Sequence, residues 1–372
     1  MRISGVLQVS AYYPPHLGGQ EVAVQDLVGQ LRSANVEVEV VTSDLGATRG
    51  VKVENGVRVT RLKSHEFGHT AFIWSLFFWL IRKTSRQTTV HLHVGQLFTP
   101  EVVWLASKII RFKYIIHLHA DLVPAGAMGR FLPVYKKLFL GREIRDAEVV
   151  IVLNEDHRRA IHQNYHRGKN LLVMSNGVND DFFKITRDPT REIIRLLFVG
   201  RLSPHKNLPR LIEALDIVKG EFALDLVGDG ECRRGLEGLV EAKNLPNVTF
   251  HGRLSRDEIK RFYSTCSALV LPSLHEAQGI VLLEAMACRM PVIATKATGL
   301  AGAIEGAVIL IDPTVQGIAN GIEDFAAMTT SEVNLLVDKA FEKAQNYSWN
   351  AVIESYIDLY KVVAGSPLRD KG

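Results

Sequence analysis

The chain has 372 residues, which is longer than one ordinary domain of about 100 to 200 residues and favours two domains. Apolar residues make up 47% of it and charged residues 23%, proportions that exclude a disordered, collagen-like or acidic-tail protein. Lys and Arg number 44 against 40 Asp and Glu, and the net charge of +4 is too dilute to indicate nucleic-acid binding.

The cysteines and the N-terminal residues bear on the cellular compartment. Cys232, Cys266 and Cys288 form no CxxC pair and no Cys/His cluster with metal spacing, which argues against a disulfide scaffold and a zinc site. The first residues lead into a strand and a turn without the features of a signal peptide, so we expect a cytoplasmic protein. The longest apolar stretch, 71–81, is shorter than the roughly 20 residues that span a bilayer, so no transmembrane helix is expected. Attachment to a membrane surface stays open.

In the first half of the chain, short runs of β-branched residues alternate with longer amphipathic segments. This alternation predicts βαβ units, and the density of Val, Ile and Leu is typical of strands buried on both faces. We expect strands at 3–9, 36–42, 89–94, 114–119 and 148–153, and helices at about 19–34, 100–110 and 131–145.

The segment 183–191 breaks this pattern with charge and proline, and we place a domain boundary there, after residue 185. A second series then predicts strands at 194–199, 222–227, 248–251, 268–271, 292–295 and 308–311, and helices at about 208–219, 231–243, 256–264 and 279–288. Three helical stretches follow residue 312, the last at about 350–363. Both halves are therefore expected to be doubly wound α/β domains, which bind ligands beyond the carboxyl ends of their strands, in a cleft between the domains.

Two of the expected strand-to-helix loops carry groups suited to phosphate. Gly18 and Gly19 precede a predicted helix, where a close backbone approach and free N–H groups can hold oxygen ligands; a tight turn without a ligand is an equally good interpretation. Gly200, Arg201 and Lys206 occupy the loop after the first strand of the second half, and the two cations could cradle a diphosphate. Solvated loop cations are the more common fate of such residues.

A pair of glutamates flanks the predicted helix at 279–288. Glu276 belongs to the loop and Glu284 to the second turn, so both side chains could point into one cleft. The N–H groups of Gly279, Ile280 and Val281 lie in the first turn, which favours an anion. A carboxylate there can bind sugar or ribose hydroxyls, although caps and dipole partners of the helix are an alternative interpretation.

The ordered set of motifs resembles the retaining GT-B glycosyltransferases of family 4. The Gly18-Gly19 turn is followed by IIHLHAD, VMSNGVNDDFF, FVGRLSPHKNLPRLIEAL, LVGDGE, VTFHGRLS and EAQGIVLLEAMACRMPVIAT, which together cover about residues 5 to 360. The resemblance implies two Rossmann-like domains facing a cleft. Residues 1–185 would lie on the acceptor side and 186–348 would bind the nucleotide sugar, with a final helix at about 349–372 crossing back to the first domain.

The resemblance also implies roles for individual residues. Arg201 and Lys206 would hold the donor's diphosphate, Glu284 the ribose, and Glu276 the hydroxyls of the donor sugar. His119 matches a histidine near the transferred sugar, and with Glu276, Arg201 and Lys206 it completes the expected catalytic group; His117 lies deeper in its strand, and His91 and His93 are ambiguous. The implied donor-binding set is Gly18, Gly19, Gly200, Arg201, Lys206, Arg253, Leu254, Glu276, Gly279, Ile280, Val281 and Glu284.

Some positions depart from the family pattern. Gln278 replaces a usual aromatic residue, Arg289 a glycine, and the segment with Thr298, Gly299 and Gly302 lacks the family's glutamate. These departures bear on donor-sugar selectivity and on whether the segment around Gly299 keeps its function. The chain contains no Asp-x-Asp, the motif that holds a divalent metal in many other glycosyltransferases. We therefore expect metal-independent transfer with no cofactor and with a nucleotide-diphosphate sugar as co-substrate.

The expected reaction moves a hexose-type sugar with retention of configuration to a glycan or lipid-linked acceptor in cell-envelope polysaccharide or glycolipid synthesis. Two apolar-aromatic stretches with terminal cations, 71–83 and 128–142, are suited to bind an anionic membrane surface, on the inner face of the membrane. For the first stretch a buried core helix is the favoured interpretation. For the second, Lys136, Lys137 and Arg142 make the two interpretations about equal.

Rival classes of function stay open. A dinucleotide-dependent oxidoreductase should carry GxGxxG followed by an acidic residue, and neither half does. A non-catalytic sugar-nucleotide-binding protein and a sugar-nucleotide epimerase of related architecture both fit the same motifs. Measured turnover distinguishes the binding protein from an enzyme. The epimerase is distinguished from a glycosyltransferase by whether the nucleotide is released to water or a separate acceptor is elongated.

Overall fold

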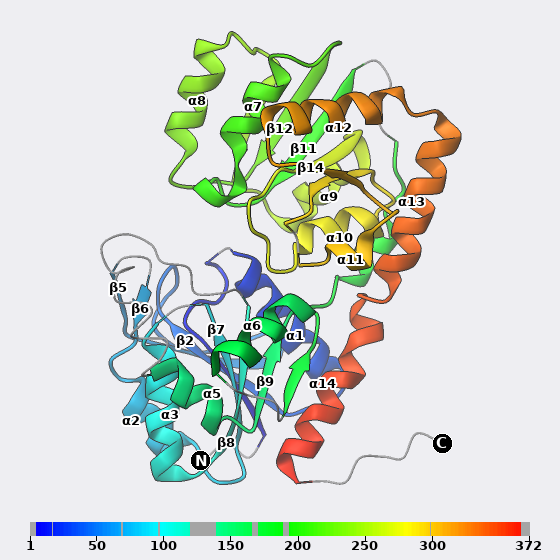
Figure 1. The fold of residues 1–372 in the computed structure, drawn as a ribbon. Coiled ribbons are helices and arrows are strands. Elements are labelled where there is room, and N and C mark those ends of the chain that lie inside the picture. The colour runs from blue at the N-terminus through cyan, green and yellow to red at the C-terminus, as the bar shows by residue number, and fades with distance from the viewer. Residues whose placement is uncertain are drawn as a thin grey trace, which may run out of the picture. The chain divides into compact units, whose positions relative to one another are not determined.

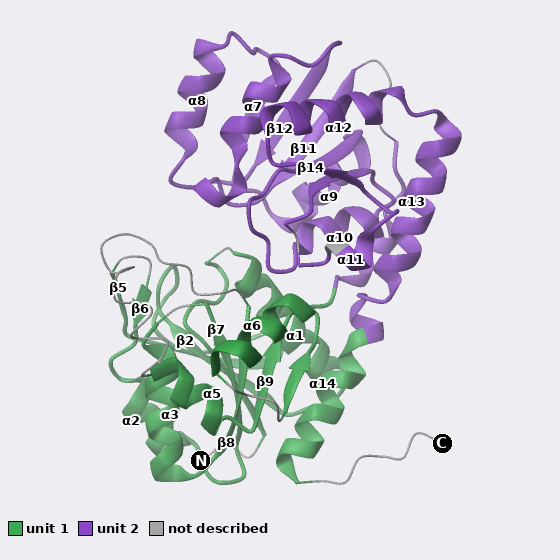
Figure 2. Cartoon of the chain, viewed as in Figure 1, with its two compact units in different colours: residues 1–177, 352–372 green, residues 178–351 purple. Residues whose placement is uncertain are grey.

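The computed structural model describes residues 5–16, 18–67, 70–95, 97–119, 139–165, 170–188, 193–297 and 299–365. The chain divides into unit 1, Met1–Gly177 with Val352–Gly372, and unit 2, Val178–Ala351 (Figure 2). The division falls before the expected boundary at residue 185. The reason is packing, because Val178 and Phe182 are fully buried in the core of unit 2.

Unit 1 is built on an eight-stranded sheet of order β10-β9-β8-β7-β1-β2-β4-β3, in which all pairs are parallel except β3 with β4. Figure 1 shows the ribbon of this unit, with β2, β7, β8 and β9 of the sheet labelled. Its strands are β1 (Val6–Ser10), β2 (Val38–Ser43), β3 (Gly50–Glu54), β4 (Val57–Leu62), β7 (Thr89–Val94), β8 (Lys113–Leu118), β9 (Val149–Val152) and β10 (Leu171–Val173). A separate antiparallel pair joins β5 (His65–Phe67) to β6 (Thr70–Phe72). The five strands expected in this half are all present.

The helices of unit 1 connect these strands and cover the sheet. They are α1 (Gly19–Ser33), α2 (Leu76–Lys83), α3 (Thr99–Ile110), α5 (Gly141–Asp146) and α6 (Glu155–Tyr165), together with the part of α14 (Trp349–Ala364) that starts at Val352. Most of the helix expected at 131–145 lies outside the described residues. The return of the last helix to the first unit agrees with the expected fold, and Tyr356 and Tyr360 of α14 are buried in unit 1.

Unit 2 contains a fully parallel sheet of order β13-β12-β11-β14-β15-β16. Its strands are β11 (Ile194–Val199), β12 (Phe222–Val227), β13 (Val248–Gly252), β14 (Ala268–Leu271), β15 (Val292–Thr295) and β16 (Ile309–Ile311). Numbered within the unit, this order is 3-2-1-4-5-6, the doubly wound order of dinucleotide-binding domains. The order reverses between β11 and β14, so a ligand is expected beyond the carboxyl ends of these two strands.

Helices cover both faces of the second sheet, which is nearly continuous in Val, Ile and Leu. They are α7 (Leu208–Leu215), α8 (Arg233–Ala242), α9 (Arg256–Thr265), α10 (Ile280–Ala287), α11 (Ala301–Ile304), α12 (Val315–Ala327) and α13 (Thr330–Gln345), with the 3₁₀ turns η3 (Asp180–Lys184) and η4 (Pro204–Lys206). Among the described helices of the chain, none is long and apolar enough to cross a bilayer.

Candidate functional site

The loops after β11 and β14 are joined to each other at the reversal point of the unit 2 sheet. The N–H of Leu274 donates to the carbonyl of His205 at 2.8 Å. The side-chain amide of the buried Asn207 donates to the carbonyls of Pro272 and Pro313, each at 3.1 Å. These bonds fix η4, which carries Lys206, against the loop that carries Glu276.

Lys206 and Glu276 form an ion pair in this place, with 2.5 Å between Nζ and Oε2. The two residues are 70 positions apart in the chain, and their side chains are only 11% and 18% exposed. Gly200 lies beside them, since a Cβ added there would be 3.8 Å from Cε of Lys206. The structure therefore brings together two of the residues that the sequence predicted for the site, one cation and one carboxylate, in a setting largely shielded from water.

Arg201 has a different partner. Its Nε donates to the carboxylate of Glu231 at 3.0 Å, and the Arg201 side chain is 52% exposed. Glu231 lies just after β12, in the segment LVGDGE, which the sequence singled out as a landmark without assigning any of its residues to the site. The two cations that the sequence predicted for phosphate are thus unequal, since Lys206 is buried and paired with Glu276 and Arg201 is on the surface.

Glu284 is buried on α10 and also has its own partner. The hydroxyl of Tyr263, on α9, donates to its Oε2 at 2.9 Å and to the carbonyl of Val281 at 3.3 Å. Burial raises the pKa of Tyr263 well above its usual value, and the Glu284 charge adds to this, so Tyr263 stays a donor. The helix begins at Ile280, one residue after the expected start near Gly279, which is in the left-handed region at φ 75°. Sequence patterns carried no signal for Tyr263, since an aromatic residue on an amphipathic helix is ordinarily core.

Three glycine loops meet at the carboxyl ends of β11, β12 and β13. The N–H of Gly200 donates to the carbonyl of Val227 at 3.0 Å, and the N–H of Gly228 donates to the carbonyl of Gly252 at 2.7 Å. A Cβ on Gly228 would stand 1.9 Å from the carbonyl oxygen of Gly200, so side chains are excluded there. Of the predicted residues after β13, Arg253 is exposed and Leu254 packs partly against the core.

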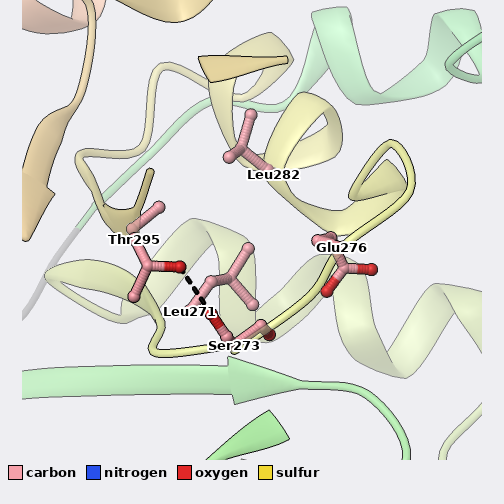
Figure 3. Close-up of a pocket in the computed structure, with 6 residues that line it drawn as sticks. Leu271, Ser273, Glu276, Leu282 and Thr295 are labelled. Atoms are coloured by element: carbon pink, nitrogen blue, oxygen red, sulfur yellow. Dashed lines mark hydrogen bonds between the residues drawn. The ribbon is translucent and has the colours of Figure 1, made fainter. Parts of the chain in front are cut away.

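A small cavity of about 10 Å³ lies beside the loop that carries Glu276 (Figure 3). It has room for about one water molecule. Ser273 lines it, and its hydroxyl is buried with no hydrogen-bond partner in the part of the chain that the structure describes, while Thr295 donates to the Ser273 carbonyl at 2.6 Å. The remaining lining residues are Leu271, Glu276, Leu282 and Ala294. The cavity is far too small for a sugar, so the ligand space must lie outside it.

Two residues that depart from the family pattern, Gln278 and Arg289, are described in the structure. Gln278 is buried, with 2% of its surface exposed. Arg289 adopts the left-handed region at φ 57°, the conformation that favours the family's glycine. Its guanidinium lies 4.0 Å from the ring centroid of Phe341 and pairs with Asp338. Thr298 lies outside the described residues.

In unit 1, the predicted glycines form the start of α1. Gly18 is the extended N-cap and Gly19 the first helical residue. A Cβ on Gly18 would be 2.2 Å from Oε2 of Glu21, and Oε1 of the same carboxylate lies 3.1 Å from Nδ1 of His16. A side chain at Gly18 would need the Glu21 carboxylate to shift, and this contact does not itself decide between a ligand loop and a simple turn.

Four buried histidines fill the ends of β7 and β8. His119 follows β8, and its ring stacks on His117 with 4.1 Å between centroids. Nδ1 of His93 lies 2.8 Å from Nε2 of His119. Burial lowers the pKa of His91 and of His119 to about 3, and lowers the pKa of His93 and His117 well below the usual value, so all four rings are neutral at neutral pH.

The position of His119 agrees with the prediction that it is nearest the end of its strand. It is 7% exposed, whereas His117 is fully buried. Ring nitrogens of His91, His93 and His117 lie within 4.8 Å of one another, a spacing compatible with a metal ion. Both nitrogens of His93 are already hydrogen-bonded and the rings stack, so we interpret the group as a hydrogen-bonded core cluster.

Two family models cover most of the chain. Residues 18–177 match the glycosyl transferase 4-like domain, and residues 178–340 match glycosyl transferases group 1. The chain is a GT-B glycosyltransferase. The two matches meet at the boundary between the structural units, so the family 4-like domain corresponds to unit 1 and the group 1 domain to unit 2.

Relatives along the whole chain are glycosyltransferases. An uncharacterised glycosyltransferase of Methanocaldococcus jannaschii is 27% identical over 307 residues, covering 81% of both chains. A GDP-mannose-dependent alpha-mannosyltransferase of Mycolicibacterium smegmatis is 25% identical, covering 96% of this glycosyltransferase and 97% of the relative. These relatives support the enzyme class.

Solved structures share the fold. Sucrose-phosphate synthase of Thermosynechococcus elongatus aligns with a TM-score of 0.79 at 22% identity, covering 97% of this chain and 99% of the other. Anabaena HepE in complex with UDP-glucose aligns with a TM-score of 0.79 at 20% identity, covering 96% and 99%. The expected GT-B architecture of two Rossmann-like domains is confirmed.

Proposed function

We propose that this glycosyltransferase moves a hexose-type sugar from a nucleotide-diphosphate donor to a glycan or lipid-linked acceptor, with retention of configuration and without a metal ion. The observation that carries the proposal is the buried Lys206–Glu276 pair at the reversal point of the unit 2 sheet. A doubly wound sheet binds its ligand at this point, and the pair supplies a cation for phosphate and a carboxylate for sugar hydroxyls.

The proposed reaction is a front-side displacement. The acceptor hydroxyl oxygen bonds to C1 of the sugar on the face that the nucleotide diphosphate leaves, while the C1–O bond to the diphosphate breaks and a leaving phosphate oxygen takes the proton. Negative charge accumulates on that phosphate, where Lys206 and, more weakly, Arg201 would stabilise it. Glu276 would hold the sugar hydroxyls, Glu284 the ribose, and His119 of unit 1 would contact the transferred sugar. With this division of roles, no metal is needed to neutralise the leaving group.

Donor recognition can be tested with a thermal-shift panel of UDP-, GDP-, dTDP- and ADP-sugars in the presence of a chelator. The cognate donor at 100 times its dissociation constant should stabilise the fold by about 2.7 kcal/mol, because it binds only the folded state. Glu284→Gln should weaken that shift, whereas Glu332→Gln, a capping glutamate on α13, should leave it unchanged. No stabilisation by any donor, or stabilisation only with added metal, would contradict the proposal.

Turnover separates the alternatives. A radiolabelled sugar should pass from the recognised donor to an acceptor in an extract of envelope glycans and lipids, with retained anomeric configuration. Binding without turnover would favour the sugar-nucleotide-binding protein. Release of the nucleotide without elongation of any acceptor would favour the epimerase.

We further infer that the acceptor is met at an anionic membrane surface of the cell envelope. The stretch 71–83, for which a core helix was favoured, is only half buried: Leu76 and Leu80 are in the core, whereas Trp74 is 70% and Phe78 is 61% exposed. Arg82 and Lys83 are the last two residues of α2, the helix in this stretch. Exposed aromatic rings beside cations suit the interface of an anionic bilayer. In the second stretch, Lys136 and Lys137 lie outside the described residues.

Co-flotation with vesicles of phosphatidylglycerol and phosphatidylcholine tests this membrane contact. The wild-type protein should float with the vesicles at low salt, and the double variant Trp74→Ala/Phe78→Ala should lose most of that binding because the apolar contact is removed. Leu335→Ala removes a comparably exposed apolar side chain from α13 and should bind as wild type does. Equal flotation of all three proteins, or no flotation of any of them, would overturn the proposed membrane contact. The proposal of sugar transfer would be unaffected.

A further inference from the structure

A continuous chain of hydrogen bonds runs from α14 to His119 through the interior of unit 1. The hydroxyl of Tyr360 lies 2.6 Å from Nδ1 of His91 and 3.0 Å from Nε2 of Gln8. Oε1 of Gln8 lies 2.7 Å from Nε2 of His93, and Nδ1 of His93 lies 2.8 Å from Nε2 of His119. All five side chains are buried, so water does not compete for these bonds.

The chemistry of each group gives this chain a direction. The Gln8 amide nitrogen can only donate, which it does to the Tyr360 oxygen, and the amide oxygen can only accept. Nε2 of His93 must therefore carry the proton that bonds to Oε1 of Gln8. Because a neutral imidazole has one N–H, Nδ1 of His93 is an acceptor, and the proton between the two histidines belongs to Nε2 of His119. The Tyr360 hydroxyl, which accepts from Gln8, has one proton that it can donate to Nδ1 of His91.

The opposite ring nitrogen of His119 is consequently unprotonated. Nδ1 of His119 is buried and has no hydrogen-bond partner among the residues that the structure describes. Stacking on His117 also fixes the plane of the ring. The ring is therefore held in place with a lone pair on Nδ1 that no described protein group uses.

We propose that Gln8, His93 and Tyr360 are positioning residues that hold His119 in its Nε2-protonated tautomer, so that Nδ1 accepts a hydrogen bond from a substrate hydroxyl. The hydrogen bond from a substrate hydroxyl to Nδ1 rests on the proposed function, whereas the tautomer of His119 does not. A helix near the end of the chain thus sets the protonation pattern of a site residue, through bonds that polarise one another in a low-dielectric interior.

The tautomer can be read directly in the full-length protein by ¹⁵N–¹H correlation spectra with ¹⁵N-labelled histidine, in which protonated and unprotonated ring nitrogens have distinct shifts. The His119 signals are assigned from their loss in His119→Gln. Wild-type protein should show a protonated Nε2 and an unprotonated Nδ1. A proton on Nδ1 would mean that the whole chain runs in the reverse direction, with the Gln8 amide turned over, and would overturn the proposal.

Matched variants separate positioning from simple packing. Gln8→Leu removes the acceptor opposite His93, and Tyr360→Phe removes the hydroxyl that orients Gln8, so both should give a mixture of His119 tautomers. Gln8→Glu keeps an oxygen that accepts from Nε2 of His93 and should preserve the wild-type tautomer. Tyr356→Phe deletes another buried hydroxyl of α14, which donates to the Ser175 carbonyl at 3.2 Å, and should not change the tautomer.

Kinetics supply the second readout. Gln8→Leu and Tyr360→Phe should lower kcat by about tenfold or more with little change in the donor KM, and Gln8→Glu should restore it, since an incorrect protonation pattern impairs catalysis without removing a binding contact. Equal kcat loss in Tyr356→Phe and Tyr360→Phe would indicate packing alone and overturn the positioning role. If the wild-type tautomer is as proposed but no donor is turned over, the proposed function fails and the hydrogen-bond chain stands.

Discussion

Lys206→Ala should lower kcat for sugar transfer by about 10²- to 10³-fold, the loss typical of removing one group that stabilises charge in a transition state. Lys206 is the buried cation of the site, and Nζ is held 2.5 Å from Glu276. Low exposure strengthens its electrostatic effect on a leaving phosphate compared with that of a surface cation. Initial rates with the donor found in the thermal-shift panel measure the effect, and the melting temperature shows whether the fold is intact.

Two further cations calibrate this result. Arg201→Ala should have a smaller effect than Lys206→Ala, because its side chain is 52% exposed and already paired with Glu231. Arg210→Ala removes an exposed cation of α7 that pairs with Glu213 and should leave kcat unchanged. A folded Lys206→Ala protein that transfers sugar at the wild-type rate would contradict the role of this lysine. Equal losses in Lys206→Ala and Arg210→Ala would point to a general effect of charge.

Gly228→Ala should destabilise unit 2 strongly and weaken donor binding with it. The new Cβ would meet the Gly200 carbonyl oxygen at 1.9 Å, and the backbone at φ 133° disfavours any side chain. Overpacking costs about 1–3 kcal/mol and backbone strain a further 1–3 kcal/mol or so. The loop that moves is the one that carries Lys206, so the donor-induced thermal shift should fall as well.

Gly235→Ala is the matched control. Gly235 lies within α8 with no atom within 4 Å of an added Cβ, so the substitution should stabilise the protein by up to about 1 kcal/mol. Urea unfolding compares the two variants, and hydrogen exchange measured by mass spectrometry localises the change to residues 178–351. A Gly228→Ala protein as stable as Gly235→Ala would show that the glycine loops can separate at little cost.

Four of the six strands of the second half were predictable to the residue. The expected runs 194–199, 222–227, 268–271 and 292–295 coincide with β11, β12, β14 and β15. Strands buried on both faces must be apolar at every position, so a local run of Val, Ile and Leu identifies them without knowledge of the partners. The same local signal placed the start of α10 near Gly279, one residue before its observed start at Ile280.

The β3–β4 hairpin was not predicted. β3 is exposed along nearly its whole length, so it lacks the apolar run that identified the other strands. The usable signal was Asn55-Gly56, both at positive φ, the pair that a two-residue hairpin turn requires. The expected domain boundary differs from the division at Val178 for a related reason, since the charge and proline at 183–191 mark a surface segment, whereas Phe182 before it is core.

Local patterns in the chain were sufficient to predict two doubly wound domains, the ends of their strands, and the loops that hold cations, glutamates and glycines. Each of these features depends on a few neighbouring residues. The partners of those groups depend on folding. Lys206 meets Glu276, Tyr263 meets Glu284, and Tyr360 reaches His91 across 269 positions of the chain. Such pairs depend on strand order and helix packing, which bring distant residues within hydrogen-bond distance, and no periodicity along the sequence encodes them.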